Sequence, residues 1–254
     1  MADRSQGRRR LDAELVRRGL AASRTQAQEL IAGGAVTVGG APADKAARQV
    51  LAGDAIEVAG PPARFVSRGG LKLDAALDHF GVAVGGRRAL DAGASTGGFT
   101  DCLLQRGATE VVAVDVGYGQ LHERLRADPR VRSFERTHVR DLARLPGLEP
   151  VPLLVADLSF ISLVKVAPAL LGACAPGADL VLLVKPQFEA GRTEVARGRG
   201  IITDPEVWRR TVADVCTAFE QLGATSLGVM VSPVHGADGN TEFLVHLRAP
   251  GGEH

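Results

Sequence analysis

Four charged residues lie at the ends of predicted strands or beside a predicted helix, where burial would make an unpaired charge costly. Asp157 and Lys185 each end an apolar run that is predicted to be a strand, the fourth and the fifth of the chain. Lys72 lies just before the helix that precedes the first predicted strand, and Glu242 opens the last one. Charges at the ends of apolar strands are costly unless they are paired. A lysine beside a carboxylate can position a hydroxyl group and take up its proton, although each residue alone could equally belong to a surface ion pair.

A glycine-rich loop follows the first predicted strand and opens the next helix. It reads D-A-G-A-S-T-G-G-F-T-D from Asp91 onward. Backbone N–H groups and a helix N-terminus at such a place can face a ligand. Asp115 ends the second predicted strand and could accept hydrogen bonds from both hydroxyls of a nucleoside ribose. The spacing departs from G-x-G-x-x-G, which weakens a dinucleotide interpretation, but the loop alone leaves NAD and S-adenosylmethionine equally open.

Strand-like and helix-like runs alternate from Arg88 onward, with helices predicted over Leu163–Cys174 and Glu206–Leu222. This alternation predicts an α/β fold with a parallel, doubly wound sheet. The last two β runs, Ser226–Val231 and Phe243–Leu247, have no helix between them and predict an antiparallel pair at the sheet edge. A mostly parallel Rossmann-like sheet with an antiparallel last strand is typical of methyltransferases rather than of dehydrogenases. Functional sites of such sheets gather at the carboxyl ends of the strands.

The N-terminal part has the pattern of a small α+β domain. Two amphipathic helices are followed by short β runs, and Ser23 with Gln26 three residues later forms a capping-box pattern before the second helix. Gly33 and Gly34 end that helix, since glycine reaches positive φ without a Cβ clash.

The charge is unevenly distributed. Residues 1–72 contain 12 Lys and Arg against 7 Asp and Glu, a net charge of +5, whereas residues 73–254 contain 18 against 22, a net charge of −4. This asymmetry predicts a polyanionic partner held mainly by the N-terminal part. A basic face that is merely solvated is the alternative.

Two prolines separate the parts. Gly60-Pro61-Pro62-Ala63 cannot continue a helix or a central strand. The predicted organisation is therefore a first domain over residues 8–60, a linker over 61–69 and a second domain over 70–250.

Several classes of protein are disfavoured by what the sequence lacks. The three cysteines Cys102, Cys174 and Cys216 are far apart and form no CxxC or Cys/His cluster, so we expect neither a disulfide nor a metal site. No secretory signal follows Met1, and the longest apolar run is far short of the roughly 20 residues that cross a bilayer. We expect a cytoplasmic monomer without metal or membrane association.

Motifs along nearly the whole chain resemble the TlyA (hemolysin A) family of rRNA 2′-O-methyltransferases. They include R-F-V-S-R-G-G-L-K-L, the glycine-rich loop, D-V-G-Y-G-Q-L, E-R-T-H-V-R-D-L, A-D-L-S-F-I-S-L, L-V-K-P-Q-F-E-A-G-R and S-P-V-H-G-A-D-G-N-T-E-F-L. The N-terminal run resembles the S-four-type RNA-binding domain. The resemblance implies an FtsJ-like methyltransferase domain that uses S-adenosylmethionine to methylate the 2′-OH of a cytidine ribose in small-subunit and, for some members, large-subunit rRNA. Such methylation sensitises bacteria to capreomycin-type antibiotics.

The resemblance also assigns roles to residues. It implies a catalytic tetrad of Lys72, Asp157, Lys185 and Glu242. The implied cofactor-binding residues are Asp91, Gly93, Ala94, Ser95, Thr96, Gly97, Gly98, Asp115, Val116, Tyr118 and His138. The implied contacts to ribosomal RNA or ribosomal subunits are Arg9, Arg10, Arg17, Arg18, Arg24, Arg64, Phe65 and Arg68.

Two positions depart from the family. His138 replaces a usual asparagine, and the linker reads Ala63-Arg64-Phe65-Val66 where a member has Arg-x-Trp-Val. Two other functions compete with the enzyme: a cytolysin, for which no membrane-inserting pattern is visible, and a non-catalytic RNA-binding protein, which would not need the tetrad.

Overall fold

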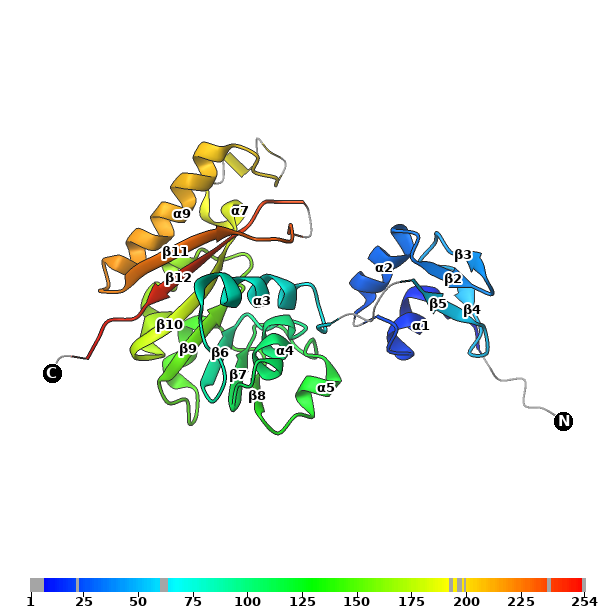
Figure 1. The fold of residues 1–254 in the computed structure, drawn as a ribbon, viewed down its shortest axis with the longest axis horizontal. Coiled ribbons are helices and arrows are strands. Elements are labelled where there is room, and N and C mark those ends of the chain that lie inside the picture. Colours follow the sequence, from blue (N-terminus) through cyan, green and yellow to red (C-terminus); the bar gives the residue numbers. More distant parts are fainter. Residues whose placement is uncertain are drawn as a thin grey trace. The chain divides into compact units, whose positions relative to one another are not determined.

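The computed structural model describes residues 7–21, 23–59, 64–191, 194–195, 198, 200–236 and 239–252. The chain divides into two compact units, residues 1–67 (the N-terminal unit) and residues 68–254 (the C-terminal unit) (Figure 1). The predicted linker begins at Pro61, and positions 60 to 63 lie outside the described residues. The predicted boundaries 8–60, 61–69 and 70–250 stay predictions.

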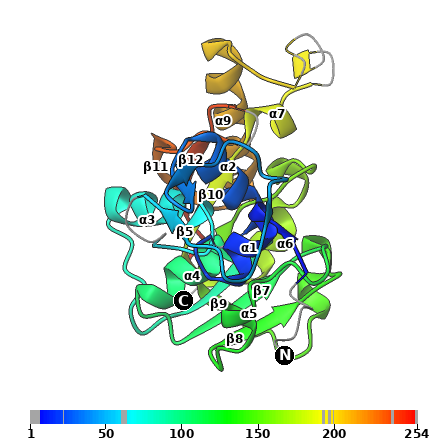
Figure 2. The same ribbon diagram turned by 90° about the vertical axis from the view of Figure 1, so that its right-hand side faces the viewer.

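The N-terminal unit pairs two helices with two small sheets. The helices α1 and α2 pack against each other (Figure 2), and strand β2 is antiparallel to both β3 and β5, while β1 pairs with β4. The bounds are β1 Arg9–Arg10, α1 Leu11–Arg17, α2 Arg24–Ala32, β2 Val36–Val38, β3 Ala41–Pro42, β4 Gln49–Val50 and β5 Ile56–Val58.

Apolar residues of helical spacing form the core of this unit. Leu11 and Leu15 of α1 meet Ala27 and Ile31 of α2 in one buried cluster. The Oγ of Ser23 accepts the N–H of Gln26 at 3.2 Å, so the predicted N-cap of α2 is confirmed.

A seven-stranded sheet forms the centre of the C-terminal unit. Its order is β11-β12-β10-β9-β6-β7-β8, in which β6 to β10 are parallel and β12 is antiparallel to both of its neighbours. The strands are β6 Arg88–Ala92, β7 Glu110–Val114, β8 Val131–Phe134, β9 Val151–Ala156, β10 Cys174–Val184, β11 Thr225–Val231 and β12 Phe243–Arg248. The predicted parallel sheet with an antiparallel last strand is confirmed.

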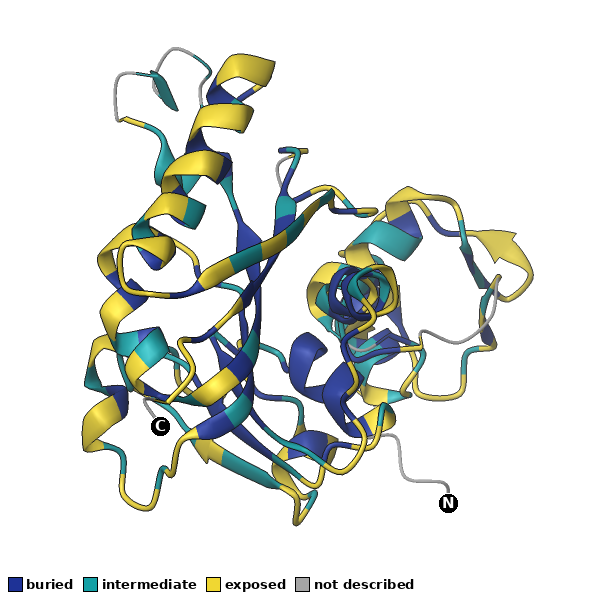
Figure 3. Cartoon of the chain, turned by 60° about the vertical axis from the view of Figure 1, so that its left-hand side comes forward, coloured by how far each residue is buried: buried dark blue, intermediate teal, exposed yellow. Residues whose placement is uncertain are grey.

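Helices cover both faces of this sheet, and its central strands are buried (Figure 3). One face packs against η1, α6 and α9 in a core that includes Leu90, Leu154, Leu142 and Phe219. Helices α3 and α4 pack together and contact the sheet through β10, β11, β6 and β7. The bounds are α3 Gly69–Phe80, α4 Gly98–Gln105, α5 Glu123–Arg126, η1 Val139–Arg144, η2 Leu163–Lys165, α6 Ala167–Gly172, α7 Pro186–Glu189 and α9 Pro205–Glu220.

Two predicted boundaries are wrong. The helix predicted over Leu163–Cys174 is split into η2 and α6, because Pro168 has no N–H to continue the hydrogen-bond ladder. Lys72 does not precede its helix, since α3 begins at Gly69 and Lys72 lies within its first turn.

Candidate active site

A cavity of about 550 Å³ opens at the carboxyl ends of the parallel strands of the C-terminal unit. Its wall comes from the segments that follow β6, β7, β8 and β9, as expected for a doubly wound sheet. The lining residues are Gly93, Ser95, Val114, Asp115, Val116, Gly117, Gln120, Thr137, His138, Val139, Asp157, Leu158, Ser159, Phe160 and Ile161.

The glycines of the loop after β6 are required by packing inside the protein. Gly93 and Gly97 have positive φ values of 88° and 97°. A Cβ on Gly93 would clash with the carbonyl oxygen of Asp157, and one on Gly97 would clash with the side chain of Leu125. In the structure these glycines bring the loop against the end of β9 and against α5.

Asp115 holds the loop across the cavity. Its carboxylate accepts the N–H of Ser95 at 2.8 Å and the N–H of Gly117 at 2.7 Å. A carboxylate offers about four lone-pair sites. Two acceptor sites therefore suffice for the loop, and two remain that a pair of ribose hydroxyls could use.

Asp91 is the last residue but one of β6, directly before the loop, and is fully buried. The hydroxyl of Thr100 donates to its Oδ2 at 2.6 Å, whereas Oδ1 has no hydrogen-bond partner among the described residues. Burial, together with the charges of Asp157 and Asp115, raises the pKa of Asp91 to about 7. Asp91 does not line the cavity, but a ligand that brings positive charge to the neighbouring loop, as S-adenosylmethionine does with its sulfonium and ammonium groups, would favour its ionised form.

Only some of the predicted cofactor residues line the cavity. Those that do are Gly93, Ser95, Asp115, Val116 and His138, and those that do not are Asp91, Ala94, Thr96, Gly97, Gly98 and Tyr118. The ring of Tyr118 is instead exposed, with the guanidinium carbon of Arg136 4.2 Å from its centroid. The Nδ1 of His138 accepts the N–H of Arg140 at 3.1 Å and caps η1, a task that an asparagine side chain can also perform.

The structure brings the four predicted catalytic residues together as two ion pairs. The Nζ of Lys185 lies 2.5 Å from Asp157 Oδ1 and donates to the Oγ of Ser159 at 2.9 Å. Lys72 of α3 forms an ion pair with Glu242, and both side chains are buried.

The pairing of β10 with β12 explains why Lys185 and Glu242 lie at the same edge of the sheet. Val184 pairs with Phe243 in the register of β10 and β12, so Lys185 leaves β10 where Glu242 enters β12. The antiparallel strand β12 thus begins at the edge where β9 and β10 end, and that edge collects residues from three distant parts of the sequence.

Sequence reasoning missed an aromatic pair beside Lys185. Phe160 is 91% exposed, has a φ of 64°, and its ring centroid lies 5.2 Å from that of Phe188. The Nζ of Lys185 is 5.8 Å from the centroid of Phe188. A non-glycine residue in the left-handed region is strained, and such strain concentrates at functional sites. Only 4% of the residues are aromatic, so the phenylalanines that end L-S-F (Phe160) and P-Q-F (Phe188), each close to a predicted catalytic residue, could have indicated this pair.

The arginines predicted to bind RNA are not equivalent. Arg9, Arg10, Arg17 and Arg24 are exposed or half-exposed. Arg18 is 20% exposed and donates to Glu14 and to the backbone carbonyls of residues 51, 52 and 54. Its guanidinium holds α1 to the β4–β5 loop, so the geometry argues against the phosphate contact predicted for it.

The residues predicted around the linker also differ from one another. Phe65 is buried, and the guanidinium carbon of Arg64 lies 4.7 Å from its ring centroid. A buried ring offers no face to an RNA base, which argues against the contact predicted for Phe65. Arg68 ends the preceding loop as the N-cap residue of α3.

No helix in the described part of the chain is long and apolar enough to cross a membrane. Within those residues, no three His, Cys, Asp or Glu side chains gather as they would around a metal ion.

Comparison with known proteins gives the class of this fold and site. Residues 65–249 match the model of the FtsJ-like methyltransferases, and residues 9–56 match the model of the S4 domain. The C-terminal unit is therefore an S-adenosylmethionine-dependent methyltransferase, preceded by an RNA-binding domain.

The relatives are more specific. The chain is 53% identical over 242 residues to the 16S/23S rRNA (cytidine-2′-O)-methyltransferase TlyA of Mycobacterium tuberculosis, covering 95% of this chain and 90% of that protein. It is 40% identical to Hemolysin A of Brachyspira hyodysenteriae, covering 94% and 99%. A solved hemolysin-type structure from Streptococcus thermophilus superposes with a TM-score of 0.76 at 38% identity, covering 98% and 92%. The chain belongs to the TlyA family of rRNA 2′-O-methyltransferases.

Proposed function

We propose that this protein transfers a methyl group from S-adenosylmethionine to the 2′-OH of a cytidine ribose in ribosomal RNA of the small subunit and, as in the mycobacterial relative, of the large subunit. The observation that carries the proposal is the Lys185–Asp157 ion pair beside the cavity at the end of the sheet. A ribose hydroxyl is a weak nucleophile, so an enzyme that methylates it must position it and control its proton.

The cavity residues suit the cofactor. S-adenosylmethionine supplies an electrophilic methyl group on a sulfonium. Asp115 would accept its ribose hydroxyls, and the positive charge of the bound cofactor would favour the ionised form of Asp91 behind the glycine loop. Ser95 and His138 line the same cavity, one from the loop after β6 and the other from the segment after β8, and would enclose the ligand.

Lys185 would act on the attacking hydroxyl. Its ammonium forms an ion pair with Asp157 and donates to the Oγ of Ser159, in a largely buried setting. Another hydrogen of the ammonium could bind the 2′-oxygen, and Asp157 would keep the lysine in place. Lys72 and Glu242 would form the neighbouring wall and orient the ribose.

Phe160 would receive the base. An aromatic ring that is almost completely exposed beside the reactive lysine can stack on a base that has left its helix, and Phe188 supports it from behind. This contact would favour a single-stranded or flipped-out nucleotide.

The N-terminal unit would recruit the substrate. Arg9, Arg10, Arg17 and Arg24 would contact phosphates, with Arg64 and Arg68 as further contacts nearer the second domain in the sequence. We infer that the protein acts in the cytoplasm, where ribosomal subunits are found, and that it does so as a monomer.

Methyl transfer from labelled S-adenosylmethionine to separated small and large ribosomal subunits, followed by mapping of the modified nucleotide, tests the proposal. We expect label on the ribose of a cytidine, and methylation of that site should increase sensitivity to capreomycin. Label on a base, or no transfer to either subunit, would contradict it. A liposome leakage assay on the same preparation tests the competing membrane function that the name of the Brachyspira relative raises.

A further inference from the structure

The N-terminal unit buries two carboxylates completely and surrounds both with arginines. Asp12 and Glu14 lie in the first turn of α1, and neither side chain is exposed. A buried carboxylate is costly unless charged partners satisfy it. The partners here are mostly side chains at the surface, so each buried charge organises exposed ones.

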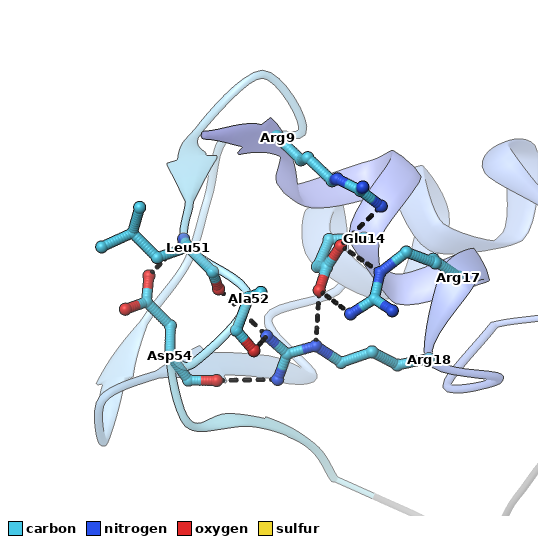
Figure 4. A network of polar contacts seen from close by, with 7 residues as sticks. All are labelled: Arg9, Glu14, Arg17, Arg18, Leu51, Ala52 and Asp54. Atoms are coloured by element: carbon cyan, nitrogen blue, oxygen red, sulfur yellow. Dashed lines mark hydrogen bonds and ion pairs between the residues drawn. The ribbon is translucent and has the colours of Figure 1, made fainter. Parts of the chain in front are cut away.

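The Glu14 cluster consists of Glu14 with Arg9, Arg17 and Arg18 (Figure 4). Arg17 donates from Nε at 2.8 Å and from Nη2 at 2.6 Å, Arg18 donates from Nε at 2.8 Å, and Arg9 lies 3.9 Å away. Three positive charges around one negative charge leave this cluster with a net charge of +2. Arg9 and Arg17 are 57% and 47% exposed, whereas Arg18 faces the backbone of the β4–β5 loop.

The Asp12 cluster consists of Asp12 with Arg10, Arg24 and Gln28. Arg10 donates to both carboxylate oxygens at 3.0 Å, Arg24 donates at 3.0 Å and Gln28 at 3.1 Å. Asp12 thereby links β1, α1 and α2, and the cluster keeps a net charge of +1. Arg10 and Arg24 are 45% and 59% exposed.

We propose that Asp12 and Glu14 are positioning residues that fix the exposed arginines of both clusters as preformed binding sites for the phosphates of a folded RNA. The inference rests on the proposed function and deepens it. A guanidinium has five N–H donors, so an arginine that gives two of them to a carboxylate can still bind a phosphate. Because its side chain is already ordered, it loses less conformational freedom when RNA binds.

Substitution of Glu14 distinguishes the ordering of arginines from general electrostatic attraction to RNA. Glu14→Gln raises the net charge of the protein by one, so long-range attraction to RNA alone would tighten binding. If Glu14 orders Arg9 and Arg17, binding should instead weaken by about five- to 100-fold. The matched control is Glu57→Gln, which removes an exposed carboxylate of β5 and raises the charge equally without touching either cluster.

The measurement is the dissociation constant of full-length protein for purified, unmethylated ribosomal subunits, with thermal melting to verify folding. Weaker binding by Glu14→Gln together with unchanged or tighter binding by Glu57→Gln supports the positioning role. Equal binding by the two variants overturns it. If wild-type protein does not bind the subunits at all, the proposed function itself is wrong.

Arg17→Lys keeps the test decisive if Glu14→Gln does not fold. This variant conserves the charge on a half-exposed side chain but removes the planar fork that Glu14 holds. We expect weaker binding by Arg17→Lys, measured on protein that thermal melting shows to be folded, and wild-type affinity of this variant would also overturn the proposal.

Discussion

Glu14 of the N-terminal unit and Asp91 of the C-terminal unit are both fully buried carboxylates, yet their pKa values move in opposite directions. Hydrogen bonds from Arg17 and Arg18 lower the pKa of Glu14 to about 2 and outweigh the effect of its burial. Burial raises the pKa of Asp91 to about 7, because a hydrogen bond from Thr100 offsets only part of the desolvation. Asp91 lies deep in the protein, whereas Glu14 lies just beneath surface arginines, so depth of burial and nearby cations together decide which carboxylate keeps its charge.

The two units use their charges differently as a result. In the N-terminal unit the carboxylates are buried and their arginines reach solvent, which suits contact with a large polyanion. In the C-terminal unit Lys72 and Lys185 are themselves largely buried beside carboxylates, which suits control of a single proton. This comparison predicts that the N-terminal unit supplies affinity for RNA and that the C-terminal unit carries out the methyl transfer.

Lys185→Ala is expected to have the largest effect on the rate of methyl transfer. Loss of one positioned acid–base group slows a reaction by about 10²–10⁴-fold. Binding of S-adenosylmethionine and of ribosomal subunits should persist, as measured by calorimetry and filter binding. Lys165→Ala, an exposed lysine of η2, is the control. Near wild-type turnover of Lys185→Ala would contradict the assignment of the tetrad.

Deletion of residues 1–60 tests the division of labour directly. The truncated protein should still bind S-adenosylmethionine but bind ribosomal subunits about 10²-fold more weakly or worse, because at least two charge-assisted hydrogen bonds to phosphates are removed. The slope of log K against log salt should also become shallower, by about 0.7–0.9 for each phosphate that the N-terminal unit neutralises in the full-length protein. Equal methylation by both forms, with the same salt slope, would leave the N-terminal unit without a recruiting role.

Asp91→Asn should change how stability depends on pH. The folded-state pKa of about 7 lies above the unfolded value of 3.8, so the folded state binds more protons and loses stability as the pH rises between these values. The loss is at most about 4 kcal/mol. Calorimetry should therefore find Asp91→Asn more stable than wild type at pH 8 but not at pH 4. Parallel pH profiles of the two proteins would refute this.

The ionisation of Glu14 makes stability depend on pH in the opposite direction from that of Asp91. Its stabilising contribution is complete above the unfolded pKa of 4.5 and is lost as the pH falls toward about 2.

Asp115→Ala should weaken binding of S-adenosylmethionine by about 1.5–3 kcal/mol, since a charged hydrogen-bond acceptor is removed. The loop itself would also lose the two N–H bonds that Asp115 accepts. Asp115→Asn is the partial control for the loop, because it removes the charge and keeps one acceptor oxygen where the carboxylate uses two. A dissociation constant unchanged in Asp115→Ala would place the ribose contact elsewhere.

Phe160→Ala should raise the KM for ribosomal subunits without altering cofactor binding. Stacking of one base on an aromatic ring is worth about 1–3 kcal/mol. Because the side chain is exposed, the melting temperature should not fall. Phe160→Trp should restore the KM, whereas full activity of Phe160→Ala would leave the ring without a role in substrate binding.

The sequence by itself determined the succession of elements and the residues that could carry chemistry. Alternation of apolar runs with helices predicted the parallel sheet. The absence of a helix between the last two β runs predicted that they pair antiparallel. Ser23 predicted the start of a helix, which the structure confirms. Each of these signals is local, because periodicity, capping and glycine act over a few residues.

Tertiary structure decided which of those residues meet. No local signal pairs Lys72 with Glu242 or Lys185 with Asp157, because those meetings depend on strand order and register. The glycine loop resembles a ligand cradle in sequence, and only packing shows that Gly93 is needed against the end of β9. Arg18 is likewise indistinguishable from Arg17 in sequence, but the fold turns one toward a backbone loop and leaves the other at the surface. Charge and spacing are encoded along the chain, whereas burial and partnership arise only when distant segments pack together.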